Sequence, residues 1–268
     1  MDIASLTLLG LIQGLTEFLP VSSTGHLILA RELFGFGDAL GLAEDAVLHL
    51  ATALAVVVYF WKDLVRLFMG SVEALRTRQR TPELTMSVAL LLATIPAVAA
   101  GLFFESSIAS VLRGSAVVAG GLVVGSLVFV GAEYFGKNIT SKKTLTVRGA
   151  VGIGLFQALA LIPGMSRSGM VISGGLFLGL SRFEAARFGF LLSFPIILGA
   201  GILKLYELLQ SGALVSVGVP LFWGAIVAFA SGMLAIHTLL RFVRTHSLMP
   251  FVVYRLLLAL VIVVSLSF

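Results

Sequence analysis

Two short segments of this chain carry side chains of the kinds that bind and cleave phosphate groups. The first segment supplies Gln13, Glu17, Ser22, Ser23, Thr24 and His26. The second supplies Ser166, Arg167 and Ser168. An arginine fork matches the oxygens of a phosphate, and a carboxylate can hold a divalent cation together with phosphate and water or act as a general base. The two segments together predict a phosphate site with Glu17 and Arg167 as catalytic residues.

The spacing within the first segment suggests further roles. Gln13 and Glu17 are four positions apart, so on a helix they share one face, and both are candidate ligands of a divalent metal such as magnesium or calcium. His26 can act as the nucleophile or as the base for a serine. A structural alternative stays open, in which Glu17 and Arg167 form only an ion pair that joins the two segments.

The hydroxyl residues stand where helix N-caps are expected. At such a position the free backbone N–H groups and the positive end of the helix dipole favour an anion. We therefore expect the following residues to cap helices and to help bind phosphate: Ser22, Ser23, Thr24, Ser166 and Ser168. Capping alone is the simpler alternative for each of them.

Composition indicates that lipid is the main solvent of the elements that carry these residues. Of the 268 residues, 59% are apolar and only 12% are charged, whereas about 25% are charged in soluble domains. The net charge of +5 is spread over short loops, which favours topology signals over a nucleic-acid partner. Without cysteine, disulfides and thiolate chemistry are excluded, and the start MDIASL lacks the basic region of a cleaved signal peptide.

The apolar runs predict an all-α polytopic membrane protein with a single membrane domain over residues 1–268. A spanning helix needs about 20 mostly apolar residues. Six stretches meet this length: 44–62, 84–104, 115–136, 184–208, 217–240 and 249–268. Regions 1–34 and 148–181 are interrupted at Pro20 and Pro163. Because a broken backbone at membrane depth must be buried or line a cavity, we interpret both regions as re-entrant helix-loop-helix hairpins.

Basic residues predict the orientation, since cytoplasmic loops are enriched in lysine and arginine. Thirteen of the fifteen lysines and arginines in the predicted loops fall in four of them, which we place inside: 62–82, 137–148, 182–187 and 241–246. Three loops then lie outside, together with both termini: 31–43, 105–114 and 209–216. Residues 1–136 and 148–268 thereby become an inverted-topology repeat, in which the two broken helices meet near the midplane.

The two segments also resemble a known family. The run Glu17-Phe-Leu-Pro-Val-Ser-Ser-Thr-Gly-His26, preceded by Gln13-Gly-Leu-Thr, is similar to one signature motif of the bacterial undecaprenyl-diphosphate phosphatase family, which is the bacitracin-resistance family. The run Pro163-Gly-Met-Ser-Arg-Ser168, followed by Ile172-Ser-Gly-Gly175, is similar to the other. The resemblance covers nearly the whole chain.

The resemblance implies hydrolysis of a polyprenyl diphosphate to polyprenyl phosphate and inorganic phosphate, which recycles the lipid carrier of peptidoglycan synthesis in the cell wall. It implies a metal-assisted site with Glu17 as the acid, Ser23 and His26 as nucleophile candidates, and Arg167 with Ser166 binding phosphate. The family pattern allows glutamate or glutamine at position 13, with glutamate common, and other members often have a glutamine at 49 and a threonine at 171. Here these positions hold Gln13, His49 and Val171, so one metal ligand and one phosphate donor are altered.

The implied location is the bacterial cytoplasmic (inner) membrane, with the site opening to the outer, periplasmic side. The expected partners are the polyprenyl diphosphate and membrane lipids, and a homodimer is among the possible assemblies. A polyprenyl-phosphate flippase is the main functional alternative, because inverted repeats with broken helices are also typical of transporters.

Overall fold

The structure, a computed structural model, describes residues 2–36, 41–110, 114–137, 145–210 and 214–266. Every regular element in these ranges is a helix. The predicted all-α class is thus confirmed for this part of the chain. Several predicted loops lie partly outside the described residues. Arg113, Lys142 and Lys143 belong to these parts.

Each half of the chain begins with a pair of short helices. In the first half these are α1 (Ile3–Phe18) and α2 (Ser23–Phe34), and in the second they are α7 (Val147–Leu159) and α8 (Arg167–Phe177). The breaks fall at the Pro20 and Pro163 segments, because proline lacks the N–H that would continue the helix. The helix-loop-helix form predicted for both regions is therefore present.

Longer helices follow each pair. In the first half they are α3 (Gly41–Tyr59), α4 (Trp61–Thr77), α5 (Pro82–Ser110) and α6 (Ser115–Lys137); in the second they are α9 (Arg182–Gln210), α10 (Leu214–Phe242) and α11 (Met249–Ser265). Within the described ranges, four helices, α5, α6, α9 and α10, are long and apolar enough to cross a membrane, and the bent pair α3 and α4 makes up to five. The chain is a multi-pass membrane protein by these criteria.

The segment 62–82 corrects one expectation, because most of it is helix and not loop. After a 72° bend at Phe60, α4 continues to Thr77 and packs against α5. Leu67 and Ala74 are buried on this contact, whereas Arg76 faces solvent. The amphipathic pattern of α4 favours a helix that lies against a neighbour, and an interpretation based only on its charges missed this pattern.

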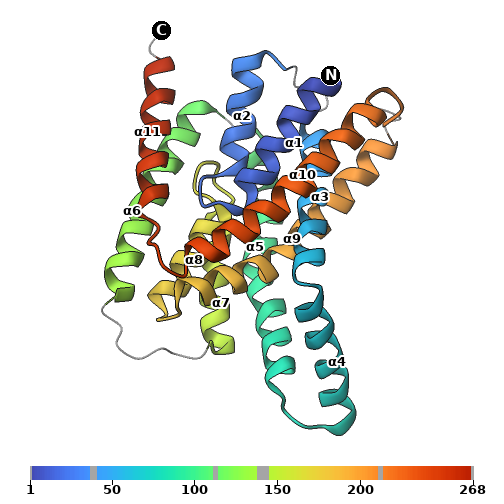
Figure 1. Cartoon of the computed structure of the whole chain (residues 1–268), viewed down its shortest axis with the longest axis vertical. Coiled ribbons are helices and arrows are strands. Elements are labelled where there is room, and N and C mark those ends of the chain that lie inside the picture. The colour runs from blue at the N-terminus through green and yellow to red at the C-terminus, as the bar shows by residue number, and fades with distance from the viewer. Residues whose placement is uncertain (1, 37–40, 111–113, 138–144, 211–213, 267–268) are drawn as a thin grey trace.

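The helices of the two halves interleave. Helix α1 packs on α10, α7 packs on α5, α3 packs on α9, and α6 packs on α11. The start of α1 and the end of α11 lie at one end of the molecule, and the α4 and α5 hairpin projects at the other (Figure 1). The two broken segments are brought together between them, and this is where the predicted site residues lie.

Candidate functional site

The helices α2 and α8 begin in the same unusual way. The N-cap of α2 is Ser22, with φ 76° and ψ 92°, and the N-cap of α8 is Ser166, with φ 71° and ψ 111°. Each serine hydroxyl accepts a hydrogen bond from the N–H of a glycine three residues later, at 3.4 Å. A positive φ is uncommon for residues other than glycine and costs on the order of 1–3 kcal/mol. Its occurrence at both breaks indicates that tertiary contacts fix these two loops.

Those contacts join one loop to the other. The N–H of Gly164 donates to the Ser22 hydroxyl at 3.2 Å, and the Ser168 hydroxyl donates to the carbonyl of Leu19 at 3.1 Å. Gly164 has φ +93°, and a Cβ there would lie 2.3 Å from the carbonyl oxygen of Val118, so only glycine fits. The two half-helix N-termini are therefore held at one place in the protein.

The Glu17 carboxylate is the centre of the site. It is buried at the end of α1, and its Oε2 accepts from the Ser23 hydroxyl at 2.6 Å and from the Gln13 amide nitrogen at 2.9 Å. Its other oxygen, Oε1, is paired with the guanidinium of Arg167. One carboxylate thus connects a hydroxyl of the first segment to the arginine of the second, and a serine bonded to a carboxylate is the arrangement of a nucleophile with its base.

His26 is turned away from this carboxylate. Its Nδ1 lies 2.8 Å from the backbone oxygen of Ser22, and its Nε2 lies 2.7 Å from the hydroxyl of Tyr254. The two rings are stacked, with centroids 5.7 Å apart. Both ring nitrogens are therefore engaged, and the structure brings Ser23, not His26, to Glu17.

The remaining predicted residues lie close to this centre, although they make fewer contacts with it. The Ser166 and Ser168 hydroxyls are 3.3 Å apart at the start of α8. The hydroxyl of Thr24 has no hydrogen bond with any residue that the structure describes, so it remains available to a ligand. Val171 is buried in the main apolar cluster, where its side chain faces the backbone of Gly189.

His49 joins the site, which the sequence alone left undecided. Its Nδ1 lies 2.8 Å from the Gln13 amide nitrogen and 3.3 Å from Glu17 Oε2. Nδ1 can accept from Gln13 only when unprotonated, and it can donate to Glu17 only when protonated, so the two contacts exclude each other. The His49 ring can therefore hydrogen-bond either to Gln13 or to Glu17, depending on whether Nδ1 carries a proton.

Arg255 of α11 is a second residue whose position the sequence did not reveal. It is fully buried, and its Nη1 and Nη2 donate to the carbonyls of Pro20 at 3.4 Å and Gly164 at 3.0 Å, one in each loop. It also bonds to two carbonyls and a serine of α6 and stands over the ring of Phe129. Arg255 therefore holds both broken segments to the rest of the bundle.

The residues present fit a divalent cation only if the ligand completes its coordination. Hard cations prefer oxygen donors, and here Glu17 offers a carboxylate while the buried Gln13 Oε1 has no hydrogen-bond partner in the described structure. No group of three or more histidine, cysteine or acidic side chains suited to a metal occurs within the described ranges. A cation at Glu17 and Gln13 would thus need phosphate oxygens and water as further ligands.

These features define a class: a helical, multi-pass membrane protein with a polar centre built where two broken helices meet. The chain belongs to the family of the bacitracin resistance protein BacA, whose family model matches residues 6–261.

Curated relatives cover nearly the same length. An undecaprenyl-diphosphatase of Alcanivorax borkumensis is 45% identical over 259 residues, which are 96% of this chain and 97% of the relative. One of Myxococcus xanthus is 43% identical over 269 residues, 100% of this chain and 90% of that protein. One of Geobacter sulfurreducens is 43% identical over 258 residues, 96% of each.

Proposed function

We propose that this protein is an undecaprenyl-diphosphatase, which hydrolyses undecaprenyl diphosphate to undecaprenyl phosphate and inorganic phosphate. The observation that carries the proposal is the Glu17 carboxylate. One of its oxygens accepts a hydrogen bond from the Ser23 hydroxyl, and its other oxygen is paired with Arg167 of the second segment. A flippase would need an anion site but not a hydroxyl activated by a carboxylate. The relatives that match over nearly the whole chain are undecaprenyl-diphosphatases, which likewise favours the hydrolase.

The geometry favours Ser23 as the nucleophile. In this reaction the Ser23 oxygen forms a bond to the terminal phosphorus while its proton passes to Glu17, and the bond from that phosphorus to the bridging oxygen breaks. The proton on Glu17 then passes to the bridging oxygen, so undecaprenyl phosphate leaves and Glu17 is a carboxylate again. Water attacks the phosphoserine while Glu17 removes a proton from that water. The bond from phosphorus to the Ser23 oxygen breaks, the proton on Glu17 returns to that oxygen, and inorganic phosphate departs.

Arg167 and the two helix starts bind the diphosphate in this proposal. A guanidinium has five N–H donors in a fixed fork, so Arg167 can hold phosphate oxygens while it remains beside Glu17. The N-termini of α2 and α8 add free backbone N–H groups and a positive dipole. Thr24 and Ser166 supply further hydroxyl donors at the same place, while the Ser168 hydroxyl already donates to the carbonyl of Leu19.

A divalent cation, magnesium or calcium, is part of the proposal and would be held by Glu17 and Gln13 with the diphosphate. When bound, it would neutralise charge that develops on the phosphate oxygens. Gln13 contributes a neutral oxygen, so the protein alone offers a weak cation site.

For the architecture, we propose six membrane spans and two re-entrant hairpins, arranged as inverted repeats over residues 1–136 and 148–268. Two observations support this proposal. Ser22 and Ser166 cap α2 and α8 with similar dihedral angles, and the first helix of each broken pair packs on a long helix of the other half, α1 on α10 and α7 on α5. The basic loops favour both termini outside, the site open to the outer side of the bacterial cytoplasmic membrane, and the α4 hairpin inside.

The test is phosphate release from undecaprenyl diphosphate by the purified protein in detergent, with magnesium or calcium and with a chelator. Ser23→Ala is expected to lower the rate constant by about a thousandfold, because the nucleophile is removed. The matched control is Ser193→Ala, since Ser193 is buried more deeply than Ser23 but bonds only to a carbonyl of its own helix. A Ser23→Ala rate within a few-fold of the control rate would refute the assigned nucleophile, and no phosphate release by the wild type under any metal condition would refute the hydrolase.

A further inference from the structure

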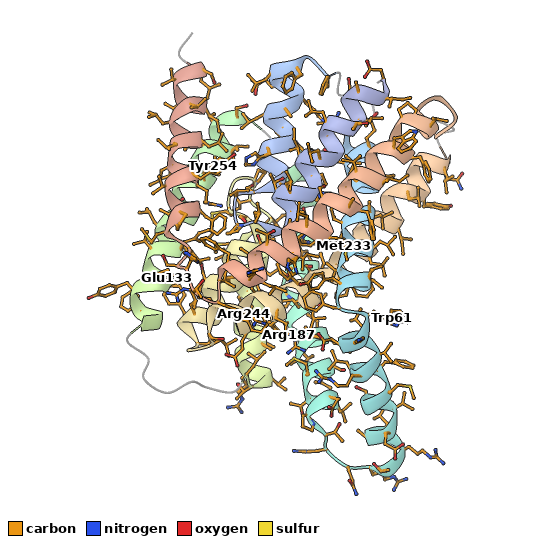
Figure 2. The ribbon with its side chains drawn as sticks, in the orientation of Figure 1. Trp61, Glu133, Arg187, Met233, Arg244 and Tyr254 are labelled. Carbon is orange, nitrogen blue, oxygen red and sulfur yellow. The ribbon has the colours of Figure 1, made fainter. Side chains whose placement is uncertain are left out.

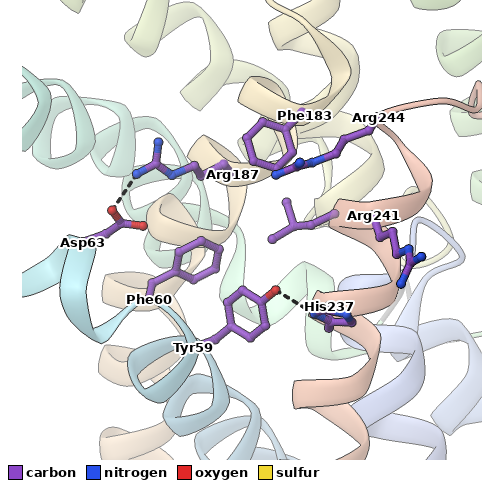
Figure 3. A pocket seen from close by; sticks show the side chains of 9 residues that line it. Tyr59, Phe60, Asp63, Phe183, Arg187, His237, Arg241 and Arg244 are labelled. Atoms are coloured by element: carbon purple, nitrogen blue, oxygen red, sulfur yellow. Dashed lines mark hydrogen bonds and ion pairs between the residues drawn. The ribbon is translucent and has the colours of Figure 1, made fainter.

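A polar cavity lies outside the two catalytic segments, between the bend at Phe60, the start of α9 and the end of α10. It has a volume of about 460 Å³. Figure 3 shows arginines from α9 and α10 around it, with aromatic rings of α3 and α9 as walls. None of the proposed catalytic residues lines this cavity.

The cavity carries an excess of positive charge. Three arginines line it, and the one carboxylate present, Asp63, is paired with Arg187 at 2.6 Å. Arg244 stands 4.3 Å above the ring of Phe183, which fixes the guanidinium without neutralising it. Arg241 has no ion pair or ring contact with any described residue. Two arginine charges are therefore unbalanced around one cavity, which is a setting that attracts an anion.

Neutral groups in the cavity suit a phosphate ester. The Tyr59 hydroxyl lies 3.2 Å from Nδ1 of His237. When the phenol donates to Nδ1, the ring proton lies on Nε2 and is free to donate to a ligand. Phe60 and Leu240, both buried, form an apolar wall beside these donors. The cavity thus combines cationic and neutral donors with a surface that an alkyl or prenyl chain can contact.

Buried aromatic rings separate this cavity from the Glu17 centre. Phe18 follows Glu17 in the chain, and its ring meets that of Phe190 at 5.5 Å, which in turn meets Phe60 of the cavity wall at 6.1 Å. All three rings are buried. Figure 2 shows the same separation, because Arg187 and Arg244 lie well below Tyr254, the partner of His26.

Orientation signals alone do not explain this arrangement. Arginines that only mark the cytoplasmic side need no cavity, and Arg76 on α4 is of that kind because it lines no part of the pocket. Arg187 of α9, Arg241 of α10 and Arg244 in the turn after α10 instead face one space. That space lies where α9 begins and α10 ends, at the boundary of two apolar spans.

We propose that this cavity is a second anion site, which binds a phosphate monoester or inorganic phosphate at the membrane face opposite the one to which we assign the catalytic site. Both ligands offer the same doubly charged group, and both are products of the proposed reaction. The site goes beyond that reaction, since it needs neither Ser23 nor Glu17.

The test measures binding to the full-length protein in detergent by calorimetry, in an Arg167→Ala background that weakens the catalytic anion site. The probes are inorganic phosphate and a short-chain prenyl monophosphate. Arg241→Gln with Arg244→Gln should weaken binding by about tenfold or more, because two charge-assisted contacts are lost. The control pair, Arg76→Gln with Arg80→Gln, removes the same charge from the same face and should leave the Kd unchanged. Equal weakening in both pairs, or no saturable binding of either probe, would overturn the proposal.

Asp63→Asn is expected to change the binding affinity in the opposite direction, towards tighter binding, which loss of folding would not produce. It releases Arg187 from its ion pair and should tighten binding several-fold. Binding of the prenyl monophosphate alone would identify a lipid headgroup as the ligand, and equal binding of both probes would identify the free phosphate group. Unchanged or weaker binding in Asp63→Asn, despite wild-type thermal unfolding, would contradict the assigned charge balance.

Discussion

Arg255 offers the most demanding test of how the site is assembled. It lies in an apolar helix, yet it donates to the carbonyls of Pro20 and Gly164, one in each broken segment. No backbone N–H donates to either carbonyl among the described residues, so Arg255 is their donor. Arg255→Met keeps an unbranched side chain comparable to the aliphatic part of arginine but removes every donor.

The cost of this change can be worked out from those two carbonyls. A buried polar group left without a partner costs about 1–3 kcal/mol, so two of them cost about 2–6 kcal/mol. The α6 carbonyls add little, because they belong to a helix and have partners in it. For a protein of this size the loss corresponds to a fall in Tm of about 5–20 °C. Arg255→Lys retains one mobile cationic group and should lose about half as much.

Thermal unfolding in detergent measures this effect, and phosphate release at a temperature where both proteins are folded measures its consequence for the site. We expect Arg255→Met to lose activity as well as stability, since the loops that carry Ser22 and Ser166 are no longer fixed. The control is Arg76→Met, because Arg76 is exposed on α4. A Tm and turnover equal to wild type in Arg255→Met, or an equal loss in Arg76→Met, would refute the role of Arg255 as a clamp.

Three further predictions concern individual residues, and a fourth concerns topology. Arg167→Lys should lower kcat/KM by about tenfold or more because lysine is a single point charge, whereas Arg182→Lys, outside the site, should not; equal effects would make the fork irrelevant. Gln13→Glu should retain activity and need several-fold less divalent metal at half-saturation, because it adds a charged ligand; an unchanged metal requirement would place the cation elsewhere. Gly164→Ala should fail to fold, since its Cβ would meet a backbone oxygen at 2.3 Å, and a wild-type Tm would show that the loop adapts. A cysteine in place of Arg78 should be labelled only from the cytoplasmic side, and labelling from outside would reverse the proposed orientation.

The broken helices could be predicted because local chemistry specifies them. Pro20 and Pro163 each interrupt an apolar run and are followed by serines that favour helix N-caps. The i, i+4 spacing of Gln13 and Glu17 likewise placed both side chains on one face, and the structure has them hydrogen-bonded at 2.9 Å. These features depend on neighbours in the sequence, which a single chain reveals.

The contacts of Arg255, Tyr254 and His49 could not be predicted in the same way. Tyr254 reaches His26 from 228 positions away, and no spacing rule covers such a separation. One signal was available, because an arginine within an apolar helix is by default a functional or structural centre, and Arg255 is such a residue. The helical form of α4 is not predicted when the lysines and arginines of 62–82 are interpreted only as a sign of a cytoplasmic loop.

The most direct test of the central claim compares Glu17→Gln with wild type in phosphate release from undecaprenyl diphosphate, at equal concentrations of folded protein. Glu44→Gln is the matched control, since Glu44 is also buried but pairs with Arg31 outside the site. Glutamine has nearly the same shape but can neither accept a proton nor hold a cation strongly, so the rate should fall by about a thousandfold or more. A Glu17→Gln enzyme that turns over at the rate of the Glu44→Gln control would show that the carboxylate is structural and would contradict the account.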